Sequence, residues 1–283
     1  MTPKSPMDRR TFVRSLSAAA AASLAGPAAA AARAPGRSAL EPVGIQLYTV
    51  RSLLSADVEG TIAAIAGIGY KEVEFAGLAG RTAAGMRAIL ERNGIRAVAS
   101  HHSMRDVREG WPKVLEDANA LGQRYVLVAS LGGADRASLD GIRAVADAFN
   151  RAGEAAKAAG LQFAYHNHDF EFRAIDGVMP YDLLLERCDA QLVQMEMDLF
   201  WIVNGGQDPL SYFAKHPGRF PLVHVKDRTA DGQMVNVGAG VIDFRGILGR
   251  ASQAGIRHWL VEHDRPSDPL ADVRASYEYL RGI

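Results

Sequence analysis

Eight short apolar segments that alternate with helical patterns constrain the fold of this chain more than any other feature of its sequence. Each apolar segment has the length of a buried strand, and each is followed by residues with apolar positions at helical spacing. Strands that alternate with helices form a parallel sheet. The expected strands are Val43–Tyr48, Lys71–Phe75, Ile95–Ser100, Tyr125–Ser130, Leu161–His168, Leu192–Asp198, Phe220–Lys226 and His258–Glu262.

Glycine and proline mark several ends of the intervening helices. Gly94, Gly122 and Gly160 each follow a helical pattern, as glycine commonly does beyond a helix C-terminus. Pro180 opens a helix at a position where proline is tolerated. The expected helices are Asp57–Ile68, Arg81–Asn93, Val107–Leu121, Asp135–Ala159, Pro180–Arg187, Pro209–Lys215, Asp243–Ala254 and Pro269–Leu280.

Eight strand–helix units with no break between domains predict a closed (β/α)8 TIM barrel, an α/β fold, over residues 43–283. The chain has 283 residues. That length suffices for a leader and one barrel of about 250 residues. The first strand is not followed by a glycine-rich phosphate loop, so a dinucleotide-binding sheet is disfavoured. The single cysteine, Cys188, excludes an internal disulfide framework and is expected in the core.

The first 32 residues do not fit the barrel pattern. Arg9 and Arg10 precede an alanine-rich apolar stretch, which looks like a twin-arginine export signal with a small-residue cleavage zone at residues 28–34. We therefore expect a signal peptide and leader at residues 1–32, a linker at 33–42, and a periplasmic or exported product. A membrane-anchoring helix is the alternative, which the interruption at Gly26-Pro27 disfavours.

The charge balance of the chain argues against a nucleic-acid partner. The chain has 32 Lys and Arg residues and 32 Asp and Glu residues. Residues 1–32 contain four basic residues and one acidic residue, so the chain without this leader is weakly acidic. A weakly acidic chain lacks the basic surface that binds phosphate backbones. The remaining sequence also has no stretch long and apolar enough to span a membrane, so a membrane partner is not expected either.

Metal-ligand side chains end four successive predicted strands. His166, Asp198, His224 and Glu262 are separated by 32, 26 and 38 residues, and each gap holds about one strand–helix unit. Neighbouring strands lie about 4.8 Å apart, so inward side chains at four adjacent strand ends can converge on one ion. Two imidazoles and two carboxylates suit manganese, zinc or cobalt better than calcium, with magnesium as a further option. His168 is the alternative to His166 in this set.

Further polar and aromatic side chains are expected around this site. Lys226 shares the inner face with His224 and is placed to neutralise an enediolate oxygen, although an ion pair with Asp227 or Glu196 explains it equally well. Glu196 shares a face with Asp198 and is expected to orient a ligand. The residues expected to contact a sugar are Gln46, Glu74, His101, His168, Glu171, Glu196 and Trp201.

Three segments at the ends of predicted strands six to eight carry a family likeness: Leu192–Trp201, Phe220–Asp227 and Trp259–Glu262. They resemble the sugar isomerase/epimerase superfamily, whose members have the xylose-isomerase-like barrel. The resemblance covers about residues 43–281 and is specific to the superfamily, but it does not define one reaction. It implies a small carbohydrate substrate and a divalent metal held by Glu, Asp, His and Glu from strands five to eight.

The matching of residues to this family pattern is incomplete. Asp198, His224 and Glu262 match its last three ligands, whereas His166 is the nearest counterpart of the first and is not a glutamate. Glu171 is similar to a glutamate that binds substrate hydroxyls in ketose epimerases. The departure at His166 puts the paired-glutamate acid/base scheme of those epimerases in doubt for this chain.

The resemblance implies an enzyme that removes a proton next to a carbohydrate carbonyl. Glu262 is then the expected base, His166 or His168 its acid partner, and Lys226 an electrostatic stabiliser. Isomerisation or epimerisation is the first expected outcome, and β-elimination or hydration of a 3-keto-glycoside or inosose is the alternative. A non-catalytic exported sugar-binding barrel is a second alternative. An abasic-site endonuclease shares the barrel, but the charge and the export signal do not fit it.

The export signal makes a direct prediction. Replacing Arg9 and Arg10 together by lysine keeps the charge but removes the two guanidinium groups that the twin-arginine pathway reads. Uncleaved precursor should then accumulate in the cytoplasm, as measured by cell fractionation and immunoblotting, with Arg14→Lys as the matched control. Unimpaired export of the double variant would show that the segment uses another route.

Overall fold

The computed structural model of this protein describes Met1, Leu40 and residues 42–283. Nearly all of the predicted signal peptide and linker lies outside the described residues. Within the described part of the chain, no helix combines the length and apolar character needed to cross a membrane.

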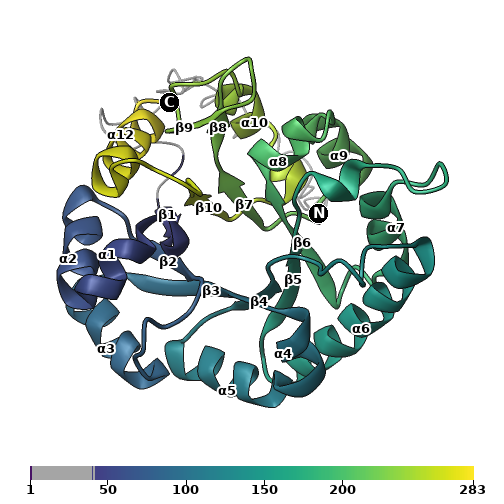
Figure 1. Cartoon of the computed structure of the whole chain (residues 1–283), viewed down its shortest axis with the longest axis horizontal. Helices are drawn as coiled ribbons and strands as arrows, with labels where there is room; N and C mark the ends of the chain where they lie inside the picture. Colours follow the sequence, from purple (N-terminus) through teal and green to yellow (C-terminus); the bar gives the residue numbers. More distant parts are fainter. Residues whose placement is uncertain (2–39, 41) are drawn as a thin grey trace. The chain divides into compact units, whose positions relative to one another are not determined.

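Eight parallel strands close into a barrel, which confirms the predicted (β/α)8 architecture (Figure 1). Around the barrel the strands follow the order β1-β10-β7-β6-β5-β4-β3-β2, and β1 closes the ring because it pairs with both β2 and β10. The barrel strands are β1 (Val43–Gln46), β2 (Glu72–Phe75), β3 (Arg96–His102), β4 (Tyr125–Val128), β5 (Gln162–His166), β6 (Val193–Asp198), β7 (Leu222–Val225) and β10 (His258–Val261).

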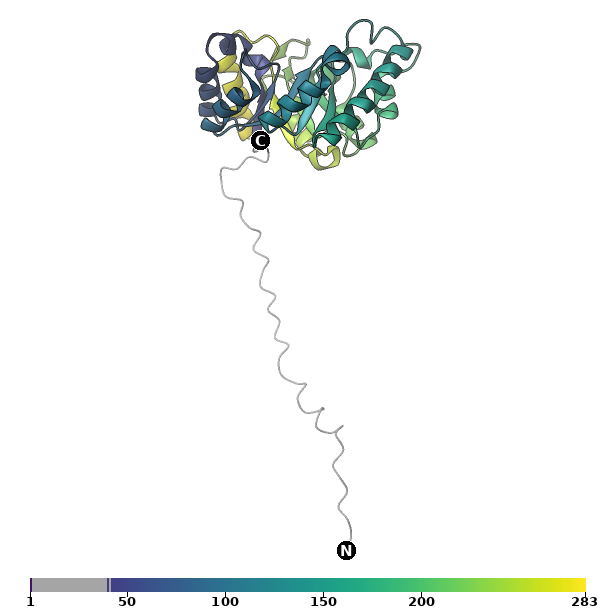
Figure 2. The same ribbon diagram turned by 90° about the horizontal axis from the view of Figure 1, so that it is seen from below.

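Helices surround the strands, as the views along and across the barrel show (Figures 1 and 2). This arrangement buries both faces of every strand, and the apolar composition of the strands is the reason that it forms. The helices are η1 (Leu47–Val50), α1 (Arg51–Ala56), α2 (Val58–Ile68), α3 (Ala83–Arg92), α4 (Met104–Glu109), α5 (Trp111–Leu121), α6 (Leu139–Ala158), η2 (Phe170–Phe172), α7 (Pro180–Arg187), α8 (Leu199–Asn204), α9 (Pro209–Lys215), α10 (Phe244–Leu248), α11 (Ala251–Ala254) and α12 (Pro269–Arg281).

Several predicted boundaries differ from the structure. The first strand ends at Gln46 because the chain turns into η1 there, the helix expected at Asp243–Ala254 is divided into α10 and α11, and the helix expected from Asp135 begins at Leu139 after the Ser138 cap.

The helix expected at Val107–Leu121 is divided at Gly110 into α4 and α5. The first part, α4, starts at Met104, three residues before the predicted start, because the Ser103 side chain caps it. The second part, α5, begins at Trp111, and Pro112 occupies its first turn. The strand expected to reach His168 ends at His166, so His168 lies in the loop that follows β5.

An antiparallel hairpin, β8 (Asp227–Arg228) with β9 (Met234–Val235), follows β7 and was not expected from the sequence. The buried carboxylate of Asp227 anchors the loop beyond it by accepting hydrogen bonds from the backbone N–H groups of Gly238, Gly240 and Ile242, at 2.9, 2.9 and 3.2 Å. These bonds fix the hairpin at the C-terminal end of the barrel.

An apolar layer inside the barrel lies below the polar residues at the C-terminal strand ends. Seven buried residues form an apolar cluster that belongs to the strands themselves: Val98, Ala99, Tyr125, Leu127, Ala164, Leu222 and Leu260. A larger apolar cluster packs the strands against the helices, and buried Cys188 belongs to it, as expected. Buried Glu72 lies at the N-terminal end of β2, whereas Gln46, Glu74, His166, Glu196, Asp198 and His224 are buried toward the C-terminal strand ends, where barrels of this type carry their sites.

Helix α6 packs closely against the segment before β6, so we expect a larger side chain at Gly153 to destabilise the protein. A Cβ added at the buried Gly153 would lie 2.6 Å from the carbonyl oxygen of Leu192. That carbonyl cannot retreat freely, because it accepts a 2.8 Å hydrogen bond from Gln162 Nε2. We expect Gly153→Ala to lower the free energy of unfolding by about 1–3 kcal/mol, as overpacking does.

The matched control is another helical glycine. Gly67 lies in α2 with open space around its Cα, so Gly67→Ala should raise the free energy of unfolding by about 0.5–1 kcal/mol through helix propensity. Urea denaturation of both variants tests the pair. Equal stability changes in the two variants would contradict the packing argument.

Candidate active site

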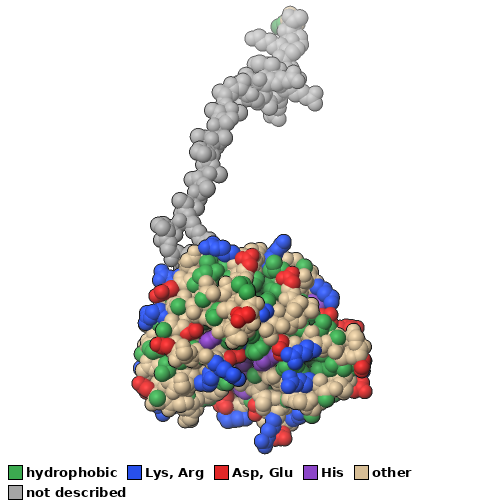
Figure 3. All heavy atoms as spheres, turned by 45° about the horizontal axis from the view of Figure 1, so that its top comes forward, with side chains coloured by type: hydrophobic (Ala, Val, Ile, Leu, Met, Phe, Trp, Pro, Cys, Tyr) green, Lys and Arg blue, Asp and Glu red, His purple; other side chains and the backbone are tan. Residues whose placement is uncertain are grey.

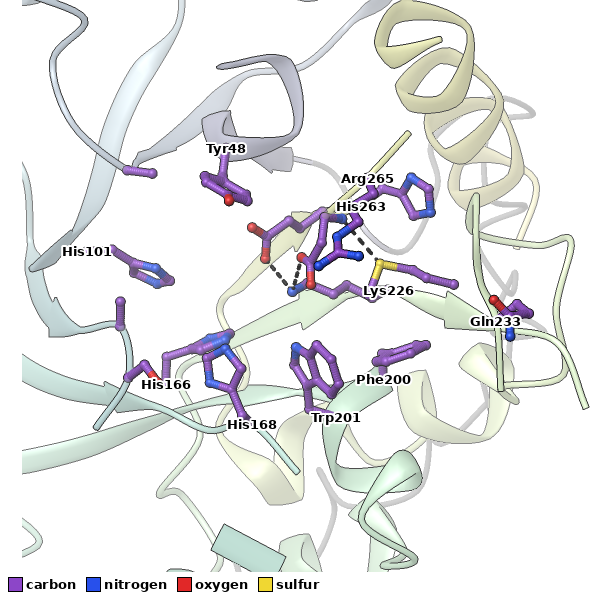
Figure 4. Close-up of a pocket in the computed structure, with 16 residues that line it drawn as sticks. Tyr48, His101, His166, His168, Phe200, Trp201, Lys226, Gln233, His263 and Arg265 are labelled. Carbon is purple, nitrogen blue, oxygen red and sulfur yellow. Dashed lines mark hydrogen bonds and ion pairs between the residues drawn. The ribbon is translucent and has the colours of Figure 1, made fainter. Parts of the chain in front are cut away.

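A pocket with a volume of about 800 Å³ opens at the C-terminal ends of the barrel strands. Histidine side chains are visible in the hollow at the centre of this face (Figure 3). The pocket brings together the following residues that the sequence predicted: His101, His166, His168, Trp201, Lys226 and Glu262 (Figure 4).

The carboxylate of Glu196 lies beneath the pocket and contacts three imidazole rings. Its Oε2 is 2.8 Å from His101 Nε2, 3.1 Å from His166 Nδ1 and 3.1 Å from His224 Nε2. Burial raises the pKa of Glu196, but His224 and the hydrogen bonds from the three rings outweigh burial and hold this pKa well below its usual value. Glu196 is therefore ionised, and each of these ring nitrogens can donate its hydrogen to it.

A second buried carboxylate, Glu74, fixes His224 from another side. Glu74 Oε2 lies 2.6 Å from His224 Nε2 and accepts a 2.8 Å hydrogen bond from Gln46 Nε2. Burial, together with the neighbouring Glu196, raises the pKa of Glu74. Because both carboxylates engage Nε2 of His224, its Nδ1 is left facing Asp198 and Glu262.

Asp198, His224 and Glu262 form a group that could hold a metal ion. One ligand atom from each lies within 4.8 Å of the others. His224 Nδ1 is 2.7 Å from Glu262 Oε2 and 3.8 Å from Asp198 Oδ2, and His166 Nε2 is 3.7 Å from the same Asp198 oxygen. The structure thus brings together all four predicted ligands, with the two imidazoles held by carboxylates behind them.

Two buried atoms of this group test whether a metal fits. Asp198 Oδ2 and His224 Nδ1 make no hydrogen bond of suitable geometry among the described residues, although Lys226 Nζ and Glu262 Oε2 lie 2.9 and 2.7 Å from them as ion-pair neighbours. Both imidazoles keep one nitrogen tied to a carboxylate and turn the other toward the group, which is the usual arrangement of a metal-ligating histidine. Two nitrogen and two carboxylate ligands match a borderline divalent cation. The residues present therefore fit a metal such as zinc, manganese or cobalt.

A second group with metal-ligand spacing comprises His101, His166, Glu196 and His224. Its contacts are the hydrogen bonds to Glu196 described above, so its nitrogens are already engaged. The two groups share His224, and we infer that the second group orients the ligands of the first and does not bind a metal itself.

Excess negative charge in this region favours cations. Burial lowers the pKa of His224, but Glu196, Glu262 and Glu74 outweigh burial and raise this pKa well above its usual value. Burial raises the pKa of Asp198 to about 6, against the opposing effect of Lys226. A bound metal would neutralise the same carboxylates and would displace a proton from the His224 ring.

Lys226 bridges three carboxylates on one side of the pocket. Its Nζ lies 2.6 Å from Glu262 Oε2 and 2.8 Å from Asp264 Oδ1 (Figure 4). It also lies 2.9 Å from Asp198 Oδ2. Burial lowers the pKa of Lys226, but the three carboxylates outweigh burial and raise it well above its usual value. Neither Asp227 nor Glu196, the two partners considered from the sequence, is among these ion-pair partners.

The two histidines of the β5 end have different surroundings. Burial and the neighbouring His224 hold the pKa of His166 well below its usual value. Burial, followed by Lys226, lowers the pKa of His168 to about 4, so both rings are neutral at neutral pH. His168 packs near the rings of both Phe170 and Trp201, at centroid distances of 5.8 and 5.5 Å. Only His166 is held by Glu196, so His166 fits the ligand position better.

Some residues expected to contact a sugar lie outside the pocket lining. Gln46, Glu74 and Glu196 are fully buried and bind each other or the imidazoles. Glu171 is also fully buried: it accepts a hydrogen bond from the hydroxyl of Tyr165 and a 2.9 Å hydrogen bond from the backbone N–H of His168. In the structure these four side chains position other residues.

Several residues that line the pocket were not predicted from the sequence. Asp264 could have been found from its position two residues beyond Glu262, although both residues follow the end of β10 at Val261. Tyr48 lies in η1, within the segment that was expected to be a strand, so alternation did not reveal its direction. Others come from the hairpin and from the loop after β10, where no periodicity marks the inward side: Gln233, Met234, His263 and Arg265.

Comparison with known proteins now identifies the class of the chain. Residues 62–283 match the family described as xylose isomerase-like TIM barrel, and the chain belongs to this family. The fold and the position of the pocket agree with this assignment.

Among individual relatives, inosose dehydratase from Geobacillus thermodenitrificans is 29% identical over 144 residues, which cover 44% of this chain and 48% of that protein. The chain thus matches about half the length of this relative. A sugar phosphate isomerase/epimerase from Parabacteroides distasonis has a similar structure, with a TM-score of 0.74 and 27% identity over 89% of this chain and 95% of that one. The IolI protein, solved with a zinc atom, shares the fold at 14% identity and a TM-score of 0.65, over 85% of this chain and 95% of that one.

The contacts of Glu196 predict that it supports metal binding without being a ligand. Glu196→Gln removes the anion that orients His166 and His224, so the affinity for Zn²⁺ should fall about 10- to 100-fold. Calorimetric titration of chelator-treated protein with Zn²⁺ measures this affinity.

Glu72→Gln is the control for that experiment. Glu72 is a buried barrel carboxylate whose Oε2 lies 2.8 Å from His258 Nδ1, and it takes no part in the group around Asp198. Its replacement should leave Zn²⁺ affinity unchanged. Equal Zn²⁺ affinities of the Glu196→Gln variant and the wild type would show that Glu196 does not orient the rings.

Proposed function

We propose that this protein is an enzyme that uses one divalent metal ion to remove a proton next to the carbonyl of a small carbohydrate. The observation that carries the proposal is the convergence of His166, Asp198, His224 and Glu262 below a pocket of about 800 Å³. The two imidazoles in this set are oriented by Glu196 and Glu74. Zinc, manganese and cobalt are the proposed metals, with magnesium as a further option.

Metal binding is assigned to His166, Asp198, His224 and Glu262. When bound, the ion would supply Lewis-acid polarisation of the substrate carbonyl. The zinc atom in the IolI structure and the donor set of this chain support the assignment.

Proton transfer is assigned to residues around this set. Glu262 is the proposed base: burial raises its pKa, but Lys226 and His224 outweigh burial and hold the pKa well below the usual value, so the carboxylate is ionised. Lys226 Nζ, 2.6 Å from Glu262, is placed to neutralise the oxygen on which negative charge develops.

The partner of Glu262 in proton transfer is His168. Both ring nitrogens of His166 are engaged, one with Glu196 and one facing Asp198. His168 lines the pocket and has no carboxylate partner among the described residues. It is therefore placed to exchange a proton with the substrate, and the rings of Phe170 and Trp201 pack beside it.

Two outcomes share this first step. Isomerisation or epimerisation, in which the proton returns to a carbon of the substrate, is the first proposal, and the name of the Parabacteroides distasonis structure supports it. Dehydration, in which the carbanion expels a leaving group, is the second, and the inosose dehydratase relatives support it. Export through a twin-arginine signal is proposed in addition, because Arg9 and Arg10 precede an alanine-rich apolar stretch in the sequence.

Product analysis by NMR in deuterated water separates these outcomes. A panel of ketoses, inososes and 3-keto-glycosides is incubated with protein loaded with Zn²⁺ or Mn²⁺. Deuterium incorporation without loss of a group identifies an isomerase or epimerase, and loss of water or of an alcohol identifies a lyase. Sugar binding without exchange in any panel member would overturn the enzymatic proposal in favour of a binding protein.

Two variants should separate metal binding from proton transfer. Asp198→Ala removes an anionic ligand and should strip the ion, whereas Glu262→Gln keeps an oxygen ligand but loses the base. We expect Glu262→Gln to retain most of its metal and to lose at least about 100-fold in exchange rate, as removal of a general base does. Mass spectrometry of metal content and deuterium exchange are the two measurements.

Asp208→Ala controls for a further role of Asp198. Asp198 also caps α8, because its Oδ1 accepts a 2.9 Å hydrogen bond from the Trp201 N–H, and Asp208 caps α9 in the same way through Leu210 N–H at 3.0 Å. Asp208→Ala should lose about 1 kcal/mol of stability and keep the metal. Full metal content in Asp198→Ala would exclude it as a ligand.

A further inference from the structure

Tyr48 is an exposed aromatic residue at the edge of the pocket. Its side chain lines the pocket and is 40% exposed, and it is the one aromatic member of the exposed large hydrophobic residues in the described part of the chain. It lies across the pocket from Trp201 and Phe200 (Figure 4). An apolar ring left in water at the mouth of a binding pocket is a candidate contact for a ligand.

Arg51 holds the Tyr48 ring in place. The guanidinium carbon of Arg51 lies 3.9 Å from the ring centroid, so one face of the ring is covered. The same guanidinium donates hydrogen bonds of 2.7 Å to the Tyr48 carbonyl and 2.9 Å to the Asp264 carbonyl. Arg51 therefore covers one face of the Tyr48 ring and also holds the Tyr48 backbone. The rest of the ring surface remains exposed to solvent.

The loop after β10 connects the segment that carries this ring to the hairpin, and the rim of the pocket, its outer compartment, is built from these three parts. Asp264 N–H contacts the Met234 sulfur at 3.2 Å, which joins the loop after β10 to the hairpin, and Arg51 joins the same loop to the segment after β1. Gln233 and Arg265 add polar groups to the lining. The compartment therefore combines an apolar platform with hydrogen-bond donors, which is the composition that suits a sugar ring.

The outer compartment lies nearer to solvent than the residues that are proposed to react with the substrate. His166, Lys226 and Glu262, which are proposed to act on the carbonyl, are almost fully buried, whereas Tyr48 is exposed at the rim. A volume of about 800 Å³ falls in the range of pockets that hold drug-sized ligands. That is more space than one hexose ring needs, so a second ring can occupy the rim while the first reaches the buried groups.

We propose that Tyr48 forms a second sugar-binding subsite, and that the substrate is a glycoside with a second ring attached to the reacting sugar. This inference rests on the proposed function for the identity of the reacting ring. The apolar face of the outer ring packs on the free face of Tyr48, and its hydroxyls face Arg265, which lies nearer to Tyr48 than Gln233 does (Figure 4).

The test compares two-ring and one-ring probes in equilibrium binding to the metal-loaded protein. Cellobiose and maltose are the two-ring probes, and the methyl glucosides of the same anomeric configuration are the one-ring probes. Calorimetry or NMR titration gives the ratio of the two affinities. Wild-type protein should bind the better two-ring probe about tenfold more tightly than its one-ring counterpart, the gain expected from one added aromatic contact.

Variants locate the effect at the aromatic ring. In Tyr48→Ala the two-ring preference should be lost, whereas Tyr48→Phe should retain it because the ring remains. Val241→Ala is the control, because Val241 is 60% exposed and does not line the pocket. Thermal unfolding of the three variants confirms that each is folded.

The outcomes separate this inference from the proposed function. A two-ring preference that disappears in Tyr48→Ala supports the subsite even if no substrate shows deuterium exchange, in which case only the enzymatic proposal fails. Equal affinity for one-ring and two-ring probes, no detectable binding of either two-ring probe, or a preference unchanged in Tyr48→Ala overturns the subsite.

Discussion

The contact of one carboxylate, Glu196, with three imidazole rings is the interaction on which the rest of the site depends. Its burial would be costly alone, and the hydrogen bonds from His101, His166 and His224 offset that cost. The carboxylate also fixes the orientation of each ring, because one ring nitrogen is held by Glu196 and the other is turned away from it. The barrel provides the rigid frame in which this geometry can persist, because each participating side chain leaves a strand that is hydrogen-bonded on both sides.

Much of this arrangement could be predicted from the sequence because it follows from periodicity. The apolar segments and their spacing define the eight strands, and the strand ends place Asp198, His224 and Glu262 at one end of the barrel. Alternation along a strand also places Lys226 beside His224. These inferences require only that inward positions recur every second residue and that parallel strands end together.

The remaining features depend on contacts between distant segments, which a single sequence does not encode in a readable form. Glu74 and Glu196 are separated by more than a hundred residues, so their joint hold on His224 could not be foreseen. Glu171 follows the β5 end closely, yet only the structure shows that it turns inward to Tyr165 and the backbone of His168. The hairpin after β7 has a turn signal, Asp231-Gly232, but strands of two residues are too short to show alternation.

The anchoring of that hairpin by Asp227 has an evolutionary consequence. Because the carboxylate of Asp227 fixes the base of the insertion through backbone N–H groups, the position of the hairpin depends little on the side chains at its tip. Gln233 and Met234 can therefore diverge without disturbing the strands below. Substitutions at Gln233 and Met234 can therefore change which ligand the pocket accepts without changing the residues of the proposed metal site.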